Sequence, residues 1–227
     1  RPWFLLNGSK RFSEPDVEGC GMRVALTGAG GFLGGAVLNH IVGSGHEVVA
    51  LSSSLDAVAG AEVVRWEATQ SWERSARALI GVDVLIHAAA HIPRHHRDAR
   101  EARRCVEVNA LGTHGLLQAC THAAVRRLIY VSGANVLSPR AASIMEDDPY
   151  GCEYSPYYLG SKVLGEIYVR AAKEVEGLIV RPSSLYGPGM GAGVIRNFVE
   201  LLLAGSPIRV QDGGRFRSDY VWCDDVA

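Results

Sequence analysis

The stretch TGAGGFLG, near the start of the chain, constrains the fold more than any other feature of the sequence. Its glycines Gly28, Gly31 and Gly34 follow an apolar run that begins at Met22, and they lead into residues 32–44, whose apolar side chains recur at helical spacing. Between a strand and a helix, such glycines permit a tight turn, bring backbone N–H groups close to a pyrophosphate, and let the helix pack closely on the strand. The spacing therefore predicts a dinucleotide-binding βαβ unit.

Short apolar runs continue along the chain and alternate with helical patterns. After the first run, strands are predicted at residues 46–52, 61–67, 82–90, 126–133 and 177–182, and helices at 70–80, 98–122 and 157–176. Alternation of this kind implies right-handed crossovers and a parallel sheet with helices on both faces. We therefore expect an α/β fold with a doubly wound parallel sheet, the Rossmann architecture, in residues 22–181.

The two ends of the chain depart from this pattern. Residues 182–227 indicate the start of a small C-terminal substrate-binding region, with a loop, a helix and a short strand predicted at 183–193, 194–205 and 206–210. Because the sequence stops inside this region, we expect the chain to be truncated. Residues 1–21 do not continue the alternation of strand and helix patterns, and they precede Met22, so a leader or an N-terminal extension is predicted there.

Composition and charge exclude several classes of partner. The chain has 48% hydrophobic and 21% charged residues, enough to bury a sizeable core, and its net charge of −1 gives no general attraction to nucleic acid or anionic lipid. No apolar run approaches the roughly 20 residues of a membrane span. The five cysteines are scattered, which favours reduced thiols in a cytoplasmic protein over disulfides. The histidines around position 91 match no standard metal site, so no metal is expected.

The end of the second predicted strand should contact the adenosine ribose of a dinucleotide. A carboxylate there would bind the 2′-hydroxyl, and an arginine would bind a 2′-phosphate. This chain has Ser52, Ser53 and Ser54 instead, with neither an acid nor a base. Both NAD and NADP therefore remain open as cofactors.

Tyr158 and Lys162 lie four residues apart within the predicted helix 157–176. Positions i and i+4 share one face of a helix, so the phenol and the ammonium can lie within a few ångströms of each other. A lysine at that distance favours the phenolate and prepares the phenol for acid/base chemistry. By spacing alone, the two could equally be neighbours on a solvated surface.

Together these motifs resemble the extended short-chain dehydrogenase/reductase family, of the nucleotide-sugar epimerase/dehydratase type. TGAGGFLG matches the family's glycine motif, HAAA at 87–90 resembles its small-residue run after the fourth strand, and NALGT, with Asn109, resembles its N-V-x-G-T helix. YLGSK is similar to its YxxxK motif, VRPSSLYGPG to its R-P-x-x-x-Y-G-P motif, and DYVWCDDVA to the segment before its last helices. The resemblance covers nearly all of residues 22–227.

The resemblance implies a role for each of these residues. Tyr158 would be the catalytic acid/base, and Lys162 would bind the nicotinamide ribose and lower the Tyr158 pKa. A hydroxyl after the fifth strand would bind the reacting oxygen; it is Ser132, although one alignment places Gly133 there. Glu67 would contact the adenine or be a surface carboxylate, and Asn109 would hold the active-site helix or cap backbone groups. The cofactor-binding residues implied in this way are Gly28, Gly31, Phe32, Leu33, Gly34, Ser52, Glu67, Ala88, Ala89, Ala90, Asn109, Tyr158, Lys162 and Pro182.

The resemblance also bears on the reaction. Family members that act as 4,6-dehydratases carry an acidic pair directly after the catalytic hydroxyl, whereas residues 133–135 here are Gly-Ala-Asn, so we expect no 4,6-dehydratase. Epimerisation or oxidoreduction of a nucleotide sugar is predicted, with Ser184 and Arg217 binding the substrate. Both positions depart from the family, which has an asparagine at 184 and its arginine at the place of Ser218.

Two other functions stay open. A carbonyl reductase of the dihydroflavonol or hydroxysteroid type would use the same triad on an apolar substrate, and the departures at Ser132 and Ser184 favour it. A non-catalytic dinucleotide-sensing binding protein would have no need for the proton donor Tyr158. The resemblance further implies a homodimer formed through the helices at 98–122 and 157–176.

Overall fold

The structure is a computed structural model in which residues 5–6, 21–138, 143–215 and 217–227 are described. Its centre is a parallel sheet of six strands: β2 (Arg23–Thr27), β3 (Glu47–Ser52), β4 (Ala61–Arg65), β5 (Val84–His87), β6 (Arg127–Val131) and β7 (Glu176–Val180). They lie in the order β7-β6-β5-β2-β3-β4, and the short strand β1 (Leu5–Leu6) runs antiparallel beside β7. The strand order reverses between β2 and β5, the point at which doubly wound sheets bind their ligands.

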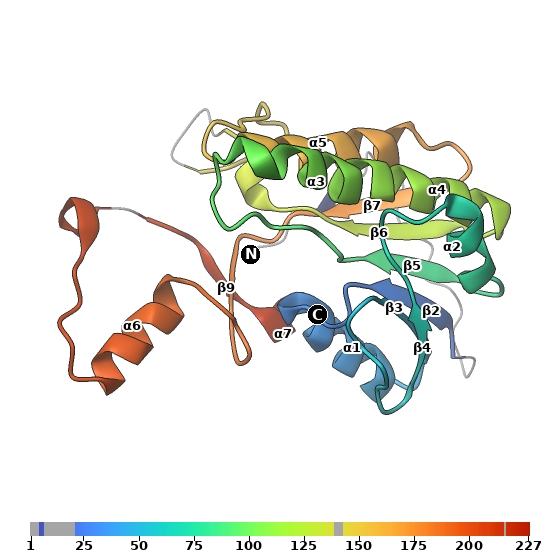
Figure 1. Ribbon diagram of the computed structural model, residues 1–227, viewed down its shortest axis with the longest axis horizontal. Helices are drawn as coiled ribbons and strands as arrows, with labels where there is room; N and C mark the ends of the chain where they lie inside the picture. The colour runs from blue at the N-terminus through green and yellow to red at the C-terminus, as the bar shows by residue number, and fades with distance from the viewer. Residues whose placement is uncertain (1–4, 7–20, 139–142, 216) are drawn as a thin grey trace.

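Helices cover both faces of this sheet (Figure 1). Helix α1 (Phe32–Gly43) lies on one face, and α2 (Trp72–Ala78), α4 (Gly112–His122) and α5 (Pro156–Ala171) lie on the other. Because successive side chains of a strand point to opposite faces, Leu26 of β2 packs in the core under α1, while its neighbour Ala25 packs in the core under the other three helices. The predicted α/β doubly wound fold is confirmed.

The helix predicted over 98–122 is interrupted. It consists of a 3-10 turn at Ala99–Glu101, helix α3 (Ala102–Cys105), a π-helical segment at Val106–Leu111, and then α4. A π-helical segment inserts an extra residue into an α-helix, frequently at a functional site. Asn109 lies within it and is buried. A one-residue insertion barely changes the apolar spacing, which is why the sequence predicted one continuous helix.

The C-terminal region differs from its prediction at two places. Strand β8 (Ser184–Tyr186) lies within the predicted loop 183–193 and pairs in parallel with β9 (Tyr220–Trp222). Residues 206–210, predicted as a strand, do not form one. A strand needs a hydrogen-bonded neighbour, and none of the described segments pairs with these residues.

Helix α6 (Val194–Leu203) lies to one side of the sheet, and the short helix α7 (Cys223–Val226) returns to pack on α1 (Figure 1). Two 3-10 turns complete the described elements, Ala134–Val136 after β6 and Gln211–Gly214 before β9. The boundary between residues 181 and 182 stays a prediction.

The leader predicted at 1–21 lies, apart from β1 and Gly21, outside the described residues. Four cysteines fall within the described ranges and all are free: Cys105, Cys120, Cys152 and Cys223. Among the described helices, none combines the length and the apolar character that crossing a membrane requires.

Candidate functional site

The glycine turn between β2 and α1 is closed to larger residues. Gly28 has a φ of +78°, and a Cβ there would lie 2.6 Å from the backbone nitrogen of Ala89, so glycine is needed where β2 meets the end of β5. A Cβ on Gly34 would overlap the carbonyl oxygen of Gly28, so glycine is also needed for α1 to start directly against the turn. The N-cap residue Gly31 has no capping side chain, which leaves the N–H groups of the first turn of α1 available to an anion.

A cavity of about 620 Å³ joins this turn to the predicted catalytic residues. It extends over the carboxyl ends of β2, β3, β5 and β6 to the first turn of α5. Every predicted cofactor residue except Asn109 lines it, and Ser132 lines it as well. The structure therefore brings together residues from positions 28 to 182, although their contacts with a cofactor stay predictions.

Tyr158 and Lys162 lie one turn apart on α5, and both line the cavity. Burial raises the pKa of the Tyr158 phenol, and Cys105 adds to this effect. The Nζ of Lys162 donates to the carbonyl oxygen of Val131 at 2.7 Å, and burial lowers the Lys162 pKa to about 7 against an opposing effect of Glu166. Desolvation thus sets the direction of the Tyr158 shift, and the lowering of this pKa by Lys162 stays a prediction.

Ser132 directly follows β6 and is buried, with 8% of its surface exposed. Its Oγ has no hydrogen-bond partner at normal geometry among the described residues, although it lies beside the Glu166 carboxylate. A buried hydroxyl without a partner needs an explanation, and an oxygen of a bound ligand would provide one. The alternative position, Gly133, offers no hydroxyl, and a Cβ there would lie 2.7 Å from Oδ1 of Asn135.

Asn109 holds two walls of the cavity together without lining it. Its Oδ1 accepts from the backbone N–H of His91 at 2.7 Å, and its Nδ2 donates to the His91 carbonyl oxygen at 3.0 Å and to Oγ of Ser161 at 2.9 Å. The Ser161 hydroxyl donates in turn to the Tyr158 carbonyl oxygen at 2.7 Å. Asn109 thus joins the loop after β5 to the helix that carries Tyr158.

Ser52 and Glu67 line the end of the cavity where the sequence predicts the adenosine to bind. Ser52 Oγ accepts hydrogen bonds from the backbone N–H groups of Ser54 and Leu55, both at 3.1 Å, so this hydroxyl closes the loop after β3. Glu67 is exposed at the cavity wall, and both of its predicted roles stay open.

The two predicted substrate-binding residues do not line this cavity. Ser184 Oγ and Ser218 Oγ lie 2.7 Å apart, so the two positions that depart from the family motif bond to each other. Arg217 is exposed. The substrate-binding roles of Ser184 and Arg217 remain predictions.

Several lining residues were not predicted: Trp66, His91, Ile92, Arg104, Val108 and Leu185. Trp66 precedes Glu67, and His91 follows the HAAA run, so extending each motif by one residue would have found both. Arg104 and Val108 come from α3 and the π-helical segment, and no sequence signal shows that this part of the chain faces the cavity.

A neutral histidine lies behind the cavity. His87 is 1% exposed, with its Nδ1 2.7 Å from Oγ1 of Thr27 and its Nε2 3.1 Å from Oγ1 of Thr113. Burial lowers the His87 pKa to about 3, and the charge of Lys162 adds to this effect. His87 is therefore a neutral link between β2, β5 and α4 and not a metal ligand.

A buried ion pair fixes α5 to the residue after β7. Glu166 and Arg181 are both almost fully inaccessible, and Arg181 Nε donates to Glu166 Oε1 at 2.9 Å while its Nη2 donates to Oε2. The Tyr150 hydroxyl also donates to Oε2, at 2.9 Å. Every oxygen of this carboxylate is therefore occupied by the protein.

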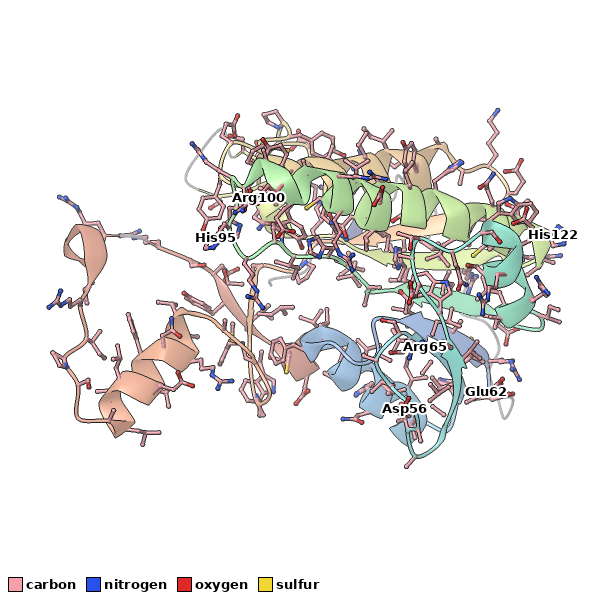
Figure 2. All side chains as sticks on the ribbon, viewed as in Figure 1. Asp56, Glu62, Arg65, His95, Arg100 and His122 are labelled. Atoms are coloured by element: carbon pink, nitrogen blue, oxygen red, sulfur yellow. The ribbon has the colours of Figure 1, made fainter. Side chains whose placement is uncertain are left out.

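Two arginines of the arginine-rich segment around α3 are paired with acids. Arg100 bonds to Asp98 at 2.8–3.1 Å, and Arg103 bonds to Glu107 at 2.6 Å. Figure 2 shows Arg100 and His95 near the start of α3, with their side chains among those at the edge of the molecule. Within the described ranges, no group of three or more His, Cys, Asp or Glu residues is arranged to hold a metal ion.

Comparison with known proteins agrees with this geometry. Residues 24–227 match the model of the NAD dependent epimerase/dehydratase family. A UDP-glucose 4-epimerase of Mycolicibacterium smegmatis is 31% identical over 225 residues, which cover 90% of this chain and 71% of that protein. A 3 beta-hydroxysteroid dehydrogenase/Delta 5→4-isomerase of Mycobacterium tuberculosis is 30% identical over 194 residues, covering 81% of this chain. The matched part is 52% of that relative, about half of its length.

Among solved structures, a dTDP-glucose 4,6-dehydratase from Streptomyces venezuelae, crystallised with NAD and TYD, superimposes with a TM-score of 0.78. It is 27% identical, and the match covers 90% of this chain and 69% of that one.

Proposed function

Because this chain belongs to the NAD dependent epimerase/dehydratase family, we propose that it uses NAD for the epimerisation or oxidoreduction of a nucleotide sugar. One observation carries the proposal: Tyr158, Lys162 and Ser132 line the same cavity as the glycine turn. The cavity fits NAD, the cofactor of the family, since the turn excludes a Cβ at Gly28 and Gly34, and Ser132 offers a buried hydroxyl without a partner.

Each catalytic side chain has one task in this mechanism. NAD, which the glycine turn at Gly28, Gly31 and Gly34 would hold, would supply the acceptor and donor of the hydride. As the phenolate, Tyr158 takes the proton from the substrate hydroxyl while that carbon is oxidised; as the phenol, it gives the proton back in the reverse direction. Ser132 donates a hydrogen bond to the same oxygen, and Lys162 stabilises the phenolate that forms on Tyr158. Asn109 keeps this helix in register with the loop after β5.

Dehydration is not part of the proposal. Removal of water from a sugar needs an additional acid and base beside the reacting carbon. Residues 133–135, which follow Ser132, are Gly-Ala-Asn and supply neither. The likeness to a 4,6-dehydratase structure therefore supports the fold and the cofactor more than the reaction.

A ketone or hydroxysteroid reductase is the second candidate, and the contact between Ser184 and Ser218 favours it. Two neutral hydroxyls that bond to each other offer no charge to a diphosphate, which arginine binds best. The hydroxysteroid dehydrogenase at 30% identity is consistent with this alternative. A thermal-shift screen with uridine and thymidine diphosphate separates the two, since only a nucleotide-sugar site would gain stability from them.

The decisive experiment incubates the protein and NAD or NADP with a panel of nucleotide sugars and, separately, of hydroxysteroids and ketones. Products are separated by chromatography and weighed by mass spectrometry, with Tyr158→Phe as the control. A product of unchanged mass would show epimerisation, and a change of two hydrogens would show oxidoreduction. Turnover that survives in Tyr158→Phe would contradict the proposed mechanism.

We also propose that two copies pair through α5 and the helix before α4. Val106, Leu111, Leu164 and Ile167 are large apolar residues on these helices, and between 37% and 53% of each is exposed. Burying them against a second copy would remove apolar surface from water. Sedimentation of the protein and of Ile167→Asp tests this, with a monomeric wild type as the contrary result.

A further inference from the structure

Lys162 carries its charge into a part of the protein with few groups that can stabilise it. The residue is 3% exposed. An ammonium has three N–H donors, and Val131 is its one hydrogen-bond acceptor among the described residues, at 2.7 Å. Burial with so little hydrogen bonding favours the neutral amine. Something else must compensate if the lysine is to remain charged.

The ionisable groups around Lys162 provide only part of this compensation. On its own helix, Tyr158 lies one turn before it and is held neutral, since burial raises the phenol pKa. Glu166 lies one turn after it and raises the Lys162 pKa, but this effect does not outweigh burial, and the carboxylate is shared with Arg181 in a buried ion pair. On β5, His87 is neutral, because burial and then the charge of Lys162 lower its pKa to about 3.

The remaining neighbour is Tyr130 on β6, a fully buried residue at 0% exposure. The Nζ of Lys162 lies 4.1 Å from the centroid of its ring. The Tyr130 hydroxyl is 3.4 Å from the Lys162 carbonyl oxygen, so the same residue contacts both ends of the lysine. A Cβ on Gly165 would overlap this hydroxyl, so the glycine is what allows α5 to pass this close to the Tyr130 ring.

We propose that Tyr130 is the positioning residue of Lys162: the face of its ring binds the ammonium and keeps it charged inside the protein. The face of an aromatic ring is electrostatically negative, and its attraction to a cation strengthens when both groups are shielded from water. The phenol stays neutral, because burial raises its pKa. The inference rests on the proposed function in one respect only, namely that the charge of Lys162 then stabilises the phenolate of Tyr158.

The chain is well suited to a direct test, because it has three lysines, Lys10, Lys162 and Lys173. With ¹³C-labelled lysine, the signal next to each amino group reports its titration by NMR. Lys162→Arg assigns the Lys162 signal, and the exposed Lys173 is an internal reference. The measurement needs no substrate and no turnover, so its outcome does not depend on which reaction the protein catalyses.

Two variants separate the ring from the hydroxyl. Tyr130→Phe keeps the ring, and we expect the Lys162 pKa to stay within about 0.3 units of the wild type. Tyr130→Leu removes the ring but preserves an apolar wall, and we expect the Lys162 pKa to fall by about one unit or more. Leu128→Ala is the matched control: Leu128 is also fully buried on β6, so its loss should reduce stability without moving this titration.

A second series avoids a change in packing. Replacing the Tyr130→Phe ring by its pentafluoro analogue reverses the charge distribution of the ring at nearly constant shape, and we expect the Lys162 pKa to fall there too. This series also decides the matter if Tyr130→Leu does not fold. An unchanged Lys162 pKa on fluorination, or an equal shift in Leu128→Ala, would overturn the proposal. A confirmed shift in a protein without turnover would leave the proposal standing and count against the proposed function.

Discussion

Removing Arg181 should produce a large and pH-dependent loss of stability. In Arg181→Met, the Glu166 carboxylate would keep its full burial, the Tyr150 hydroxyl and the Arg170 guanidinium at 3.7 Å, but lose two hydrogen bonds and its nearest counter-charge. Breaking a buried pair by removing one partner costs about 3–5 kcal/mol. For a chain of this length, that corresponds to a fall in Tm of about 6–20 °C. It is also a substantial share of a typical unfolding free energy of about 5–15 kcal/mol.

The loss should be larger at pH 7 than at pH 5. In the native protein, burial raises the Glu166 pKa, but the hydrogen bonds and charge of Arg181, with contributions from Ser132 and Tyr150, outweigh it and lower the pKa. The ion pair therefore contributes stability above the unfolded glutamate pKa of about 4.3, and this contribution is lost as the pH falls through the folded value. In Arg181→Met, burial is left to raise the pKa, so the carboxyl takes up a proton near neutrality and the penalty shrinks on acidification.

Urea unfolding followed by tryptophan fluorescence at both pH values measures these effects. The double variant Glu166→Leu/Arg181→Met is the control, because it removes the uncompensated charge; we expect it to recover most of the lost stability. A loss below about 1 kcal/mol in Arg181→Met, or a double variant less stable than the single one, would refute the reasoning.

Three further perturbations test other parts of the site. Gly34→Ala places a Cβ against the backbone of the glycine turn, so the free energy of unfolding should fall by about 1–3 kcal/mol and calorimetry should show weaker NAD binding. Gly43→Ala is the control, because Gly43 lies in the same helix with open space around it, and it should show neither effect. His87 has a folded pKa of about 3, below its unfolded value, so its protonation on acidification favours the unfolded chain. The free energy of unfolding should therefore drop by about 2 kcal/mol from pH 8 to pH 5. His87→Gln should lack this part of the drop. Ser132→Ala leaves the neighbouring Glu166 carboxylate its hydrogen bonds from Arg181 and Tyr150, so stability should change by less than about 1 kcal/mol while turnover falls about 10²-fold. Equal activity would remove Ser132 from the mechanism.

The sequence predicted the order of strands and helices and the position of the glycine turn, because both depend on local chemistry. Apolar runs and helical spacing are properties of consecutive residues. The turn requires glycine at Gly28 and Gly34, where any side chain would meet backbone, so its signature is visible in a few letters. The spacing of Tyr158 and Lys162 likewise placed them on one helix face before any tertiary contact was known.

The tertiary structure decided what surrounds those residues. Local sequence does not show that Tyr130 lies under Lys162, that Ser184 bonds to Ser218, or that the π-helical segment at Val106–Leu111 interrupts the predicted helix. Nor does it show that burial raises the Tyr158 pKa, because the spacing of this residue to a lysine is local whereas its burial is not. Desolvation depends on every element packed around a group, and those elements come together only when the whole sheet is formed.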